Sequence, residues 1–95
     1  MEMRQVKIIK TLLETGSYTK TAKLLNYTQS NVTQQVQLLE KTLNQKLFDY
    51  NHKQLLPTPF LKDILPMINQ IYDASQRIKQ VSEHNNCLLY TSLMA

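Results

Sequence analysis

Five uncharged side chains that donate and accept hydrogen bonds gather in a short segment of the sequence. Residues three and four positions apart share one face of an α-helix, and that spacing relates Gln29, Ser30, Thr33, Gln34 and Gln37. An exposed helix face usually carries Lys and Glu, so a face of amides and hydroxyls is suited to reading a partner. Helix-turn-helix units place such residues at the start of their second helix, where they contact base edges in the DNA major groove. We therefore predict that these residues contact DNA bases.

The opposite side of this segment is apolar, which predicts how the segment is held in a fold. Val32, Val36, Leu39 and Leu43 follow one another at intervals of four, three and four residues, the spacing of one helical stripe. A helix is therefore predicted from about residue 29 to 43. A shorter helix is predicted over residues 18–25, with residues 26–28 as the turn between the two.

The starts of these two helices suit contact with a phosphate backbone. An amphipathic helix is predicted over residues 3–15 and ends at Gly16, so Ser17 and Thr28 stand at the N-cap positions of the next two helices. Free backbone N–H groups at helix starts are natural anchors for phosphates. DNA backbone contacts are expected from Ser17, Thr19, Lys20 and Thr28, although ordinary capping explains the two cap residues as well.

A small hairpin is predicted after the third helix, with strands at residues 47–50 and 54–56. Such a hairpin beside a helix-turn-helix unit is a wing. His52 and Lys53 at its tip are expected to lie along the DNA backbone or in a minor groove. A solvated turn explains the same residues.

A long helix is predicted from Pro59 to about Glu83, with Thr58 as its N-cap. Its apolar residues follow the three-and-four spacing of paired helices over several turns, more than the preceding unit needs for its own core. Pairing with the same helix of a second subunit is therefore expected, through Phe60, Leu61, Ile64, Ile68, Ile71 and Ile78. The alternative is that this stripe folds back on its own headpiece and leaves a monomer.

Composition limits the fold and the chemistry. The 95 residues, with a net charge of +4 and 42% hydrophobic residues, allow one modest core and suit a phosphate partner. One Gly and three Pro favour a mainly helical fold. One Cys and two distant His give neither a disulfide nor a metal site, and no catalytic set appears. We expect no enzyme, no metal and no cofactor. The N-terminus lacks a signal peptide or a membrane span, so a cytoplasmic location is expected.

Three parts of the chain are predicted from these patterns. Residues 1–57 form a winged helix-turn-helix of three helices and a two-stranded wing. Residues 58–84 form a linker and dimerisation helix. Residues 85–95 drop the helical periodicity, and we expect a disordered tail or an end left by truncation or addition.

The run from residue 1 to about 68 resembles the N-terminal DNA-binding headpiece of LysR-type transcriptional regulators. The resemblance implies a winged helix-turn-helix with a linker helix that pairs two subunits, and binding to an interrupted inverted repeat in bacterial promoter DNA. It also implies base contacts at Gln29, Ser30, Thr33 and Gln34 and a wing contact at Lys53. Family members normally also carry an effector-binding domain that drives tetramer formation; we expect no small-molecule site in this chain. The matching residues are Gly16-Ser17-Tyr18-Thr19, Ala22, Leu25, Thr28-Gln29-Ser30, Val32-Thr33, Leu39-Glu40, Leu43, Leu47-Phe48 and Leu65-Pro66.

The chain departs from the family pattern where cations are usual. Gln34 stands where Arg often follows the Ser, and the wing is poor in Arg. Fewer cations predict weaker non-specific affinity and a shallower salt dependence. We expect sequence-specific double-stranded DNA binding by a dimeric regulator. The alternative is a protein-interaction module that pairs with full-length relatives and titrates them.

Overall fold

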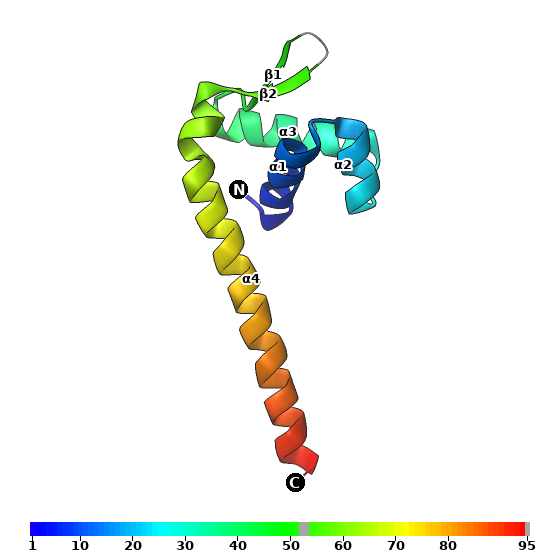
Figure 1. Ribbon diagram of the computed structural model, residues 1–95, viewed down its shortest axis with the longest axis vertical. Coiled ribbons are helices and arrows are strands. Elements are labelled where there is room, and N and C mark those ends of the chain that lie inside the picture. Colours follow the sequence, from blue (N-terminus) through cyan, green and yellow to red (C-terminus); the bar gives the residue numbers. More distant parts are fainter. Residues whose placement is uncertain (52–53, 95) are drawn as a thin grey trace.

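The computed structural model describes residues 1–51 and 54–94, with side chains described through residue 84. Its elements are α1 (Met3–Thr15), α2 (Tyr18–Leu25), α3 (Gln29–Leu43), β1 (Phe48–Asn51), β2 (Gln54–Pro57) and α4 (Pro59–Met94). Figure 1 shows the first three helices and the hairpin gathered at one end of the molecule, from which α4 projects. The predicted mainly α, winged helix-turn-helix fold with a long following helix is confirmed.

Helix ends fall where the sequence places residues that tolerate left-handed backbone. Gly16, Asn26 and Asn44 close α1, α2 and α3 with φ angles of 65°, 61° and 53°. Glycine has no Cβ to clash there, and the short Asn side chain is tolerated better than most. These residues explain why the predicted ends of the three helices agree with the structure.

Helix starts depend on side chains that accept backbone hydrogen bonds. The Ser17 hydroxyl accepts from the Lys20 N–H at 3.2 Å, and the Thr28 hydroxyl accepts from the Asn31 N–H at 3.0 Å. Each bond satisfies one of the donors that a first turn leaves without an intrahelical acceptor. Both predicted N-caps are confirmed.

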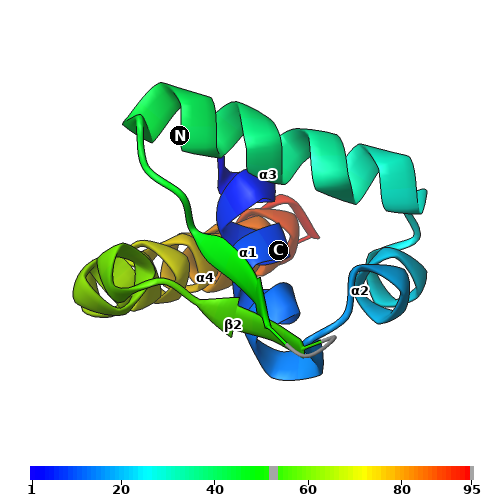
Figure 2. The same ribbon diagram turned by 90° about the horizontal axis from the view of Figure 1, so that it is seen from above.

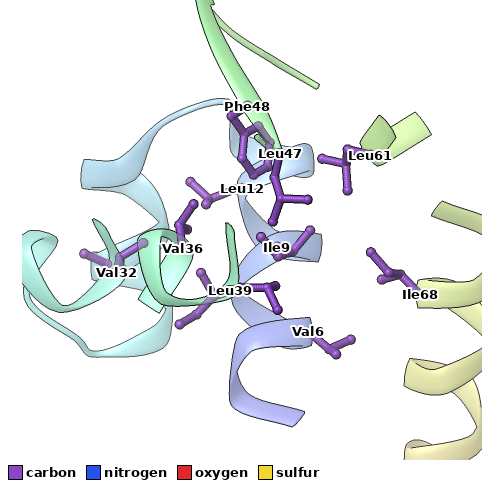
Figure 3. Close-up of a cluster of buried hydrophobic side chains, with 12 residues drawn as sticks. Val6, Ile9, Leu12, Val32, Val36, Leu39, Leu47, Phe48, Leu61 and Ile68 are labelled. Carbon is purple, nitrogen blue, oxygen red and sulfur yellow. The ribbon is translucent and has the colours of Figure 1, made fainter. Parts of the chain in front are cut away.

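One hydrophobic core joins the three helices to the hairpin and to the first half of α4. Figure 3 shows its side chains converging from α1, α3, the start of the hairpin and α4. Leu47 and Phe48 lie between the helices, so the base of the wing is anchored in the core. The labelled core residues are Val6, Ile9, Leu12, Val32, Val36, Leu39, Leu47, Phe48, Leu61 and Ile68.

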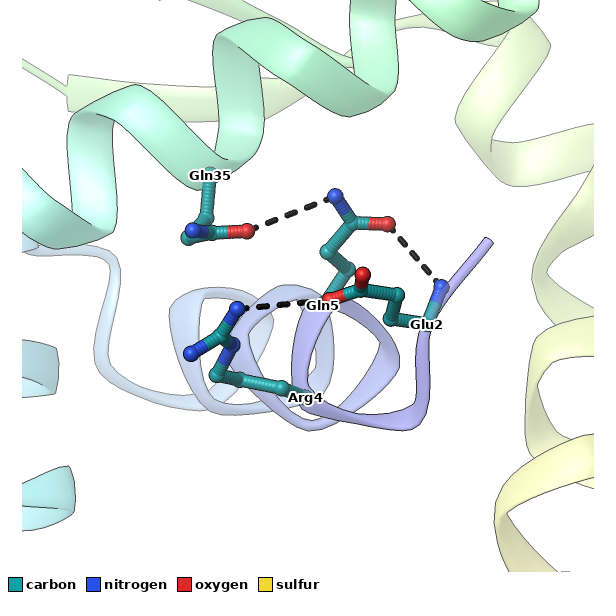
Figure 4. A network of polar contacts seen from close by, with 4 residues as sticks. All are labelled: Glu2, Arg4, Gln5 and Gln35. Atoms are coloured by element: carbon teal, nitrogen blue, oxygen red, sulfur yellow. Dashed lines mark hydrogen bonds and ion pairs between the residues drawn. The ribbon is translucent and has the colours of Figure 1, made fainter.

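A polar contact supplements this packing between α1 and α3. Gln5 is almost fully buried, and its Nε2 donates to Gln35 Oε1 of α3 at 3.4 Å. Gln5 Oε1 in turn accepts from the Glu2 backbone N–H at 3.0 Å (Figure 4). Both ends of the buried amide are therefore paired, which removes most of the cost of burying it.

The wing is an antiparallel pair in which Phe48 faces Pro57 and Asn51 faces Gln54. Side-chain hydrogen bonds lock its base. The Glu40 carboxylate accepts from the Leu47 N–H at 2.8 Å. The buried Thr58 hydroxyl donates to the Lys46 carbonyl at 2.6 Å and accepts from the Leu61 N–H at 3.3 Å. Thr58 is thus both a support for the wing and the predicted N-cap of α4.

The long helix continues beyond its predicted end. We expected it to finish near Glu83 and the last residues to form a tail, but α4 is helical to Met94. Residues 84–94 contain neither Gly nor Pro, so no helix-breaking residue stops the backbone there. Loss of amphipathic periodicity was therefore a poor indicator of the helix end.

Candidate nucleic-acid interface

The five predicted base-contacting residues lie together. Gln29, Ser30, Thr33, Gln34 and Gln37 line one open groove of about 450 Å³ on the outer surface of α3. Thr33 is half-buried and the other four side chains are exposed. No Lys, Arg, Asp or Glu lines this groove. Its chemistry is that of amide and hydroxyl groups, which donate and accept hydrogen bonds without a net charge.

Burial of the opposite stripe turns this groove outward. Val32, Val36 and Leu39 are 0%, 2% and 1% exposed, so the rotation of α3 about its axis is fixed by the core. The groove residues lie on the opposite face of the helix from these three residues, so they face solvent.

A rigid turn fixes α2 against the start of α3. The Tyr27 N–H donates to the Ala22 carbonyl at 2.9 Å, and the Asn26 N–H donates to the Lys23 carbonyl at 3.3 Å. These bonds close α2 in the manner of a Schellman motif. Figure 2 shows α2 beside the N-terminal end of α3. The two helix starts are therefore held in a defined relation.

The predicted phosphate-contacting residues sit at these two helix starts. Thr19, Lys20 and Thr28 are exposed and Ser17 is half-buried. The Lys20 and Asn31 N–H groups are capped, but in the described part of the chain those of Tyr18, Thr19, Gln29 and Ser30 bond no protein acceptor. These free donors and the positive ends of the helix dipoles can bind anions. His52 and Lys53, predicted to contact DNA from the wing, lie outside the described residues.

A hydrogen bond joins the two predicted contact sets. The Thr19 hydroxyl of α2 donates to Gln29 Oε1 of α3 over 3.2 Å. Sequence reasoning assigned Thr19 to the phosphate backbone and Gln29 to the bases, and it missed that they touch. Helical periodicity relates residues of one helix only, so no signal in it could reveal a contact across the turn.

Tyr18 lies half-buried at the start of α2, and its pKa is raised from 10.0. Burial is the main cause, because it disfavours the charged phenolate; the nearby Glu40 carboxylate and then Tyr50 add to the shift. The phenol therefore stays neutral in the fold to a higher pH than it does in water.

The predicted pairing residues of α4 divide into two groups. Leu61 and Ile68 are 0% and 2% exposed in the headpiece core, which corrects their assignment to a free pairing face. Phe60 and Ile64 are half-buried and pack on the same core. The spacing of apolar residues could not distinguish a core partner from a second subunit, because both bury the same kind of stripe.

The remaining part of the stripe is open to solvent. Ile71 and Ile78 are 40% and 70% exposed. Together with Met3, Ala74 and Ser75 they line an apolar groove of about 490 Å³. This surface lies between the start of α1 and the middle of α4, beyond the last buried residue of that helix, Ile68.

Residues 1–51 and 54–94 lack a metal-ligating cluster and a membrane-spanning helix. No three His, Cys, Asp or Glu side chains there come together as metal ligands. Over the same ranges, no helix combines the length and the apolar character that crossing a bilayer requires.

Comparison with known proteins gives one family. Residues 3–60 match the family described as bacterial regulatory helix-turn-helix protein, lysR family. The chain is 38% identical over 82 residues to the HTH-type transcriptional regulator CzcR of Bacillus anthracis, covering 85% of this chain and 28% of that protein. It is 32% identical over 97 residues to the HTH-type transcriptional regulator YofA of Bacillus velezensis, covering 98% and 34%. The chain thus spans about a third or less of the length of these transcriptional regulators.

Solved structures share the fold of this chain. A crystal structure of the CbnR DNA-binding domain in complex with DNA matches with a TM-score of 0.78 and 28% identity, over 88% of this chain and 97% of that one. The LysR family transcriptional regulator CbnR itself matches with a TM-score of 0.79 and 29% identity, over 87% of this chain and 29% of that one.

Proposed function

We propose that this chain, which belongs to the lysR family of bacterial regulatory helix-turn-helix proteins, binds a specific double-stranded DNA sequence through the polar face of α3. The observation that carries the proposal is the groove whose lining is Gln29, Ser30, Thr33, Gln34 and Gln37. The DNA complex of the CbnR domain supports DNA as the partner. A second groove, at the start of α2, is lined by charged and apolar residues instead: Glu14, Thr15, Lys20, Lys23 and Leu24.

The groove residues have the chemistry of base recognition. A Gln amide can pair with the N6 and N7 atoms of adenine, and a Thr methyl can contact the methyl of thymine. Each good bidentate contact discriminates against the wrong base by about 1–3 kcal/mol. Gln29 and Thr33 are thus the residues from which we expect most of the selectivity.

Backbone contacts orient this face. We propose that Ser17, Thr19, Lys20 and Thr28 contact phosphates at the starts of α2 and α3, and that His52 and Lys53 do so from the wing. Such contacts fix the register of a protein on the duplex but read no sequence. Because Lys20 and Lys53 are the only full charges in this set, the electrostatic part of the affinity should be small.

The open half of α4 supports a dimer. We propose that Ile71 and Ile78, exposed within an apolar groove, pack against a second copy of α4 in the bacterial cytoplasm. Two headpieces held in this way would bind the two halves of an inverted repeat. This arrangement compensates for the weak binding expected of a single headpiece.

Selection from a random duplex library tests DNA binding, followed by anisotropy titration on the recovered site. We expect a salt-sensitive complex, and we expect Gln29→Ala with Thr33→Ala to lower specific affinity at least tenfold while the dimer persists. Enrichment of no sequence at low salt would refute the proposal.

The exposed stripe of α4 also suits a second function, pairing with full-length relatives to titrate them. In that case, mixing this chain with a full-length relative should form heterodimers. The double variant Gln29→Ala with Thr33→Ala should then reduce operator occupancy by the relative as much as the wild type does. Under the DNA-binding proposal the double variant should lose its effect on operator occupancy.

A further inference from the structure

The Thr19 hydroxyl makes a bond that helix formation does not require. Ser17 caps α2, so Thr19 is free of that task. Threonine hydroxyls inside helices often turn back to a carbonyl of their own helix, as Thr11 does to Lys7 and Thr42 does to Leu38. Thr19 is the second residue of α2, so no carbonyl of α2 lies one turn before it, and its hydroxyl donates across the turn to Gln29.

This bond restrains the residue best suited to read a base. Gln29 is the first residue of α3, and its side chain is exposed. A free Gln side chain has many rotamers, and ordering it on DNA costs conformational entropy. The bond to Thr19 over 3.2 Å holds the carbonyl end in place before DNA arrives. Removal of water at the DNA surface strengthens such a bond.

We propose that Thr19 is a positioning residue that presents the Gln29 amide in one orientation, and that the base so read is adenine. The inference rests on the proposed function of the α3 groove. With Oε1 turned toward Thr19, the Nε2 group points away and donates outward. Oε1 keeps a second lone pair, so one amide can donate to adenine N7 and accept from adenine N6 at once.

Guanine does not fit this presentation. Its major-groove edge carries two acceptors, N7 and O6, and the held carbonyl oxygen would face one of them. Cytosine offers only a donor and thymine only an acceptor. Each can therefore bond either the carbonyl or the NH₂ group of the Gln29 amide, but not both. Adenine is the base whose donor and acceptor match both ends of the side chain.

The experiment compares base preferences of the full-length chain carrying Thr19→Val, Thr19→Ser or Gln29→Ala with those of the wild type. Each protein selects sites from a random duplex library, and the recovered sites are remeasured by titration. Thr42→Val is the matched control, because its hydroxyl bonds only within α3. Thr19→Val should lose roughly threefold to tenfold of the preference for adenine at one position, the equivalent of one net hydrogen bond. Thr19→Ser and Thr42→Val should keep it.

A double-mutant cycle separates positioning from phosphate contact. Positioning predicts that Thr19→Val has no further effect on base preference when Gln29 is already Ala, whereas loss of a phosphate contact lowers the affinity for all sequences alike in either background. In the free protein, the Gln29 side-chain NH₂ should be ordered by NMR relaxation in the wild type and mobile in Thr19→Val.

Three outcomes overturn the inference. If the wild type enriches a site but Thr19→Val weakens all sequences equally, Thr19 contacts phosphate only, and the proposed function stands. If Gln29→Ala removes preference for a base other than adenine, the assignment of the base is wrong. If the wild type enriches no sequence, the proposed function itself fails and the inference fails with it.

Discussion

Lys10 of α1 donates a hydrogen bond to Asn69 of α4 over 3.0 Å, and its ammonium lies 4.5 Å from the centre of the Tyr72 ring. One side chain thus makes two contacts with the long helix beyond the last core residue, Ile68. These contacts extend the attachment of α4 to α1 past the buried core.

Replacing Lys10 by Ala should lower the free energy of unfolding by about 1 kcal/mol, because it removes a hydrogen bond and a cation–π contact at a partly exposed site. Urea unfolding followed by circular dichroism measures this. Lys7→Ala is the control, since Lys7 is an exposed lysine of the same helix. Equal losses in the two variants would contradict the assignment.

Replacing Thr58 by Val should lower the free energy of unfolding by about 1–3 kcal/mol, more than the Lys10→Ala change does. The change keeps the shape of the side chain but removes the acceptor of the Leu61 N–H and the donor to the Lys46 carbonyl at a buried site. Thr58→Ser should recover most of the loss in thermal unfolding. A Ser variant as unstable as the Val variant would show that packing of the methyl, and not the hydroxyl, matters.

The raised pKa of Tyr18 makes stability depend on pH in the alkaline range. The folded state holds the neutral phenol more tightly than the unfolded state does, so this contribution is complete below pH 10 and is lost as the pH rises through the folded-state pKa. Unfolding measured from pH 8 to 11 should therefore show wild type losing stability relative to Tyr18→Phe only above about pH 10. A constant difference between the two proteins would contradict this.

Substitutions at core residues and at proposed pairing residues of α4 should have different effects on unfolding and on dimerisation. Leu61→Ala should lower the unfolding free energy by about 2–5 kcal/mol, the usual cost of truncating a fully buried leucine. Ile78→Glu should leave headpiece unfolding within about 0.5 kcal/mol of wild type. The same variant should weaken dimerisation in sedimentation experiments by at least tenfold, because Ile78 is exposed in the single chain. A wild type that stays monomeric at every concentration would refute the dimer.

Lys20 provides a test of the backbone contacts. Lys20→Gln should weaken binding to all DNA sequences alike and reduce the slope of log affinity against log salt by about 0.9, the share of one neutralised phosphate. Lys79→Gln, far along α4, should leave the slope unchanged. A change in base preference with Lys20→Gln would show that this side chain reaches a base.

The helices and the polar groove could be predicted from sequence because local signals specify them. Gly16, Asn26 and Asn44 mark helix ends by their tolerance of positive φ, and Ser17 and Thr28 mark starts by their hydroxyls. The exposed face of α3 followed from the periodicity of its apolar residues alone.

Features that depend on tertiary placement could not be predicted in this way. The stripe of α4 reads the same whether Leu61 and Ile68 meet their own core or a partner helix. The bond from Thr19 to Gln29 joins two helices whose relative position no periodicity encodes. Gln5 is a polar residue whose burial depends on a partner in α3.

Thr58 connects the wing and the long helix through one side chain, so a movement of one is passed to the other. The molecule extends 61 Å along its longest axis, and α4 occupies most of that length (Figure 1). The buried Thr58, Leu61 and Ile68, together with the contact from Lys10, hold the first part of α4 in the same packed unit as α3 and the wing. A tilt of this anchored part of α4 would therefore turn the DNA-facing groove and the wing with it.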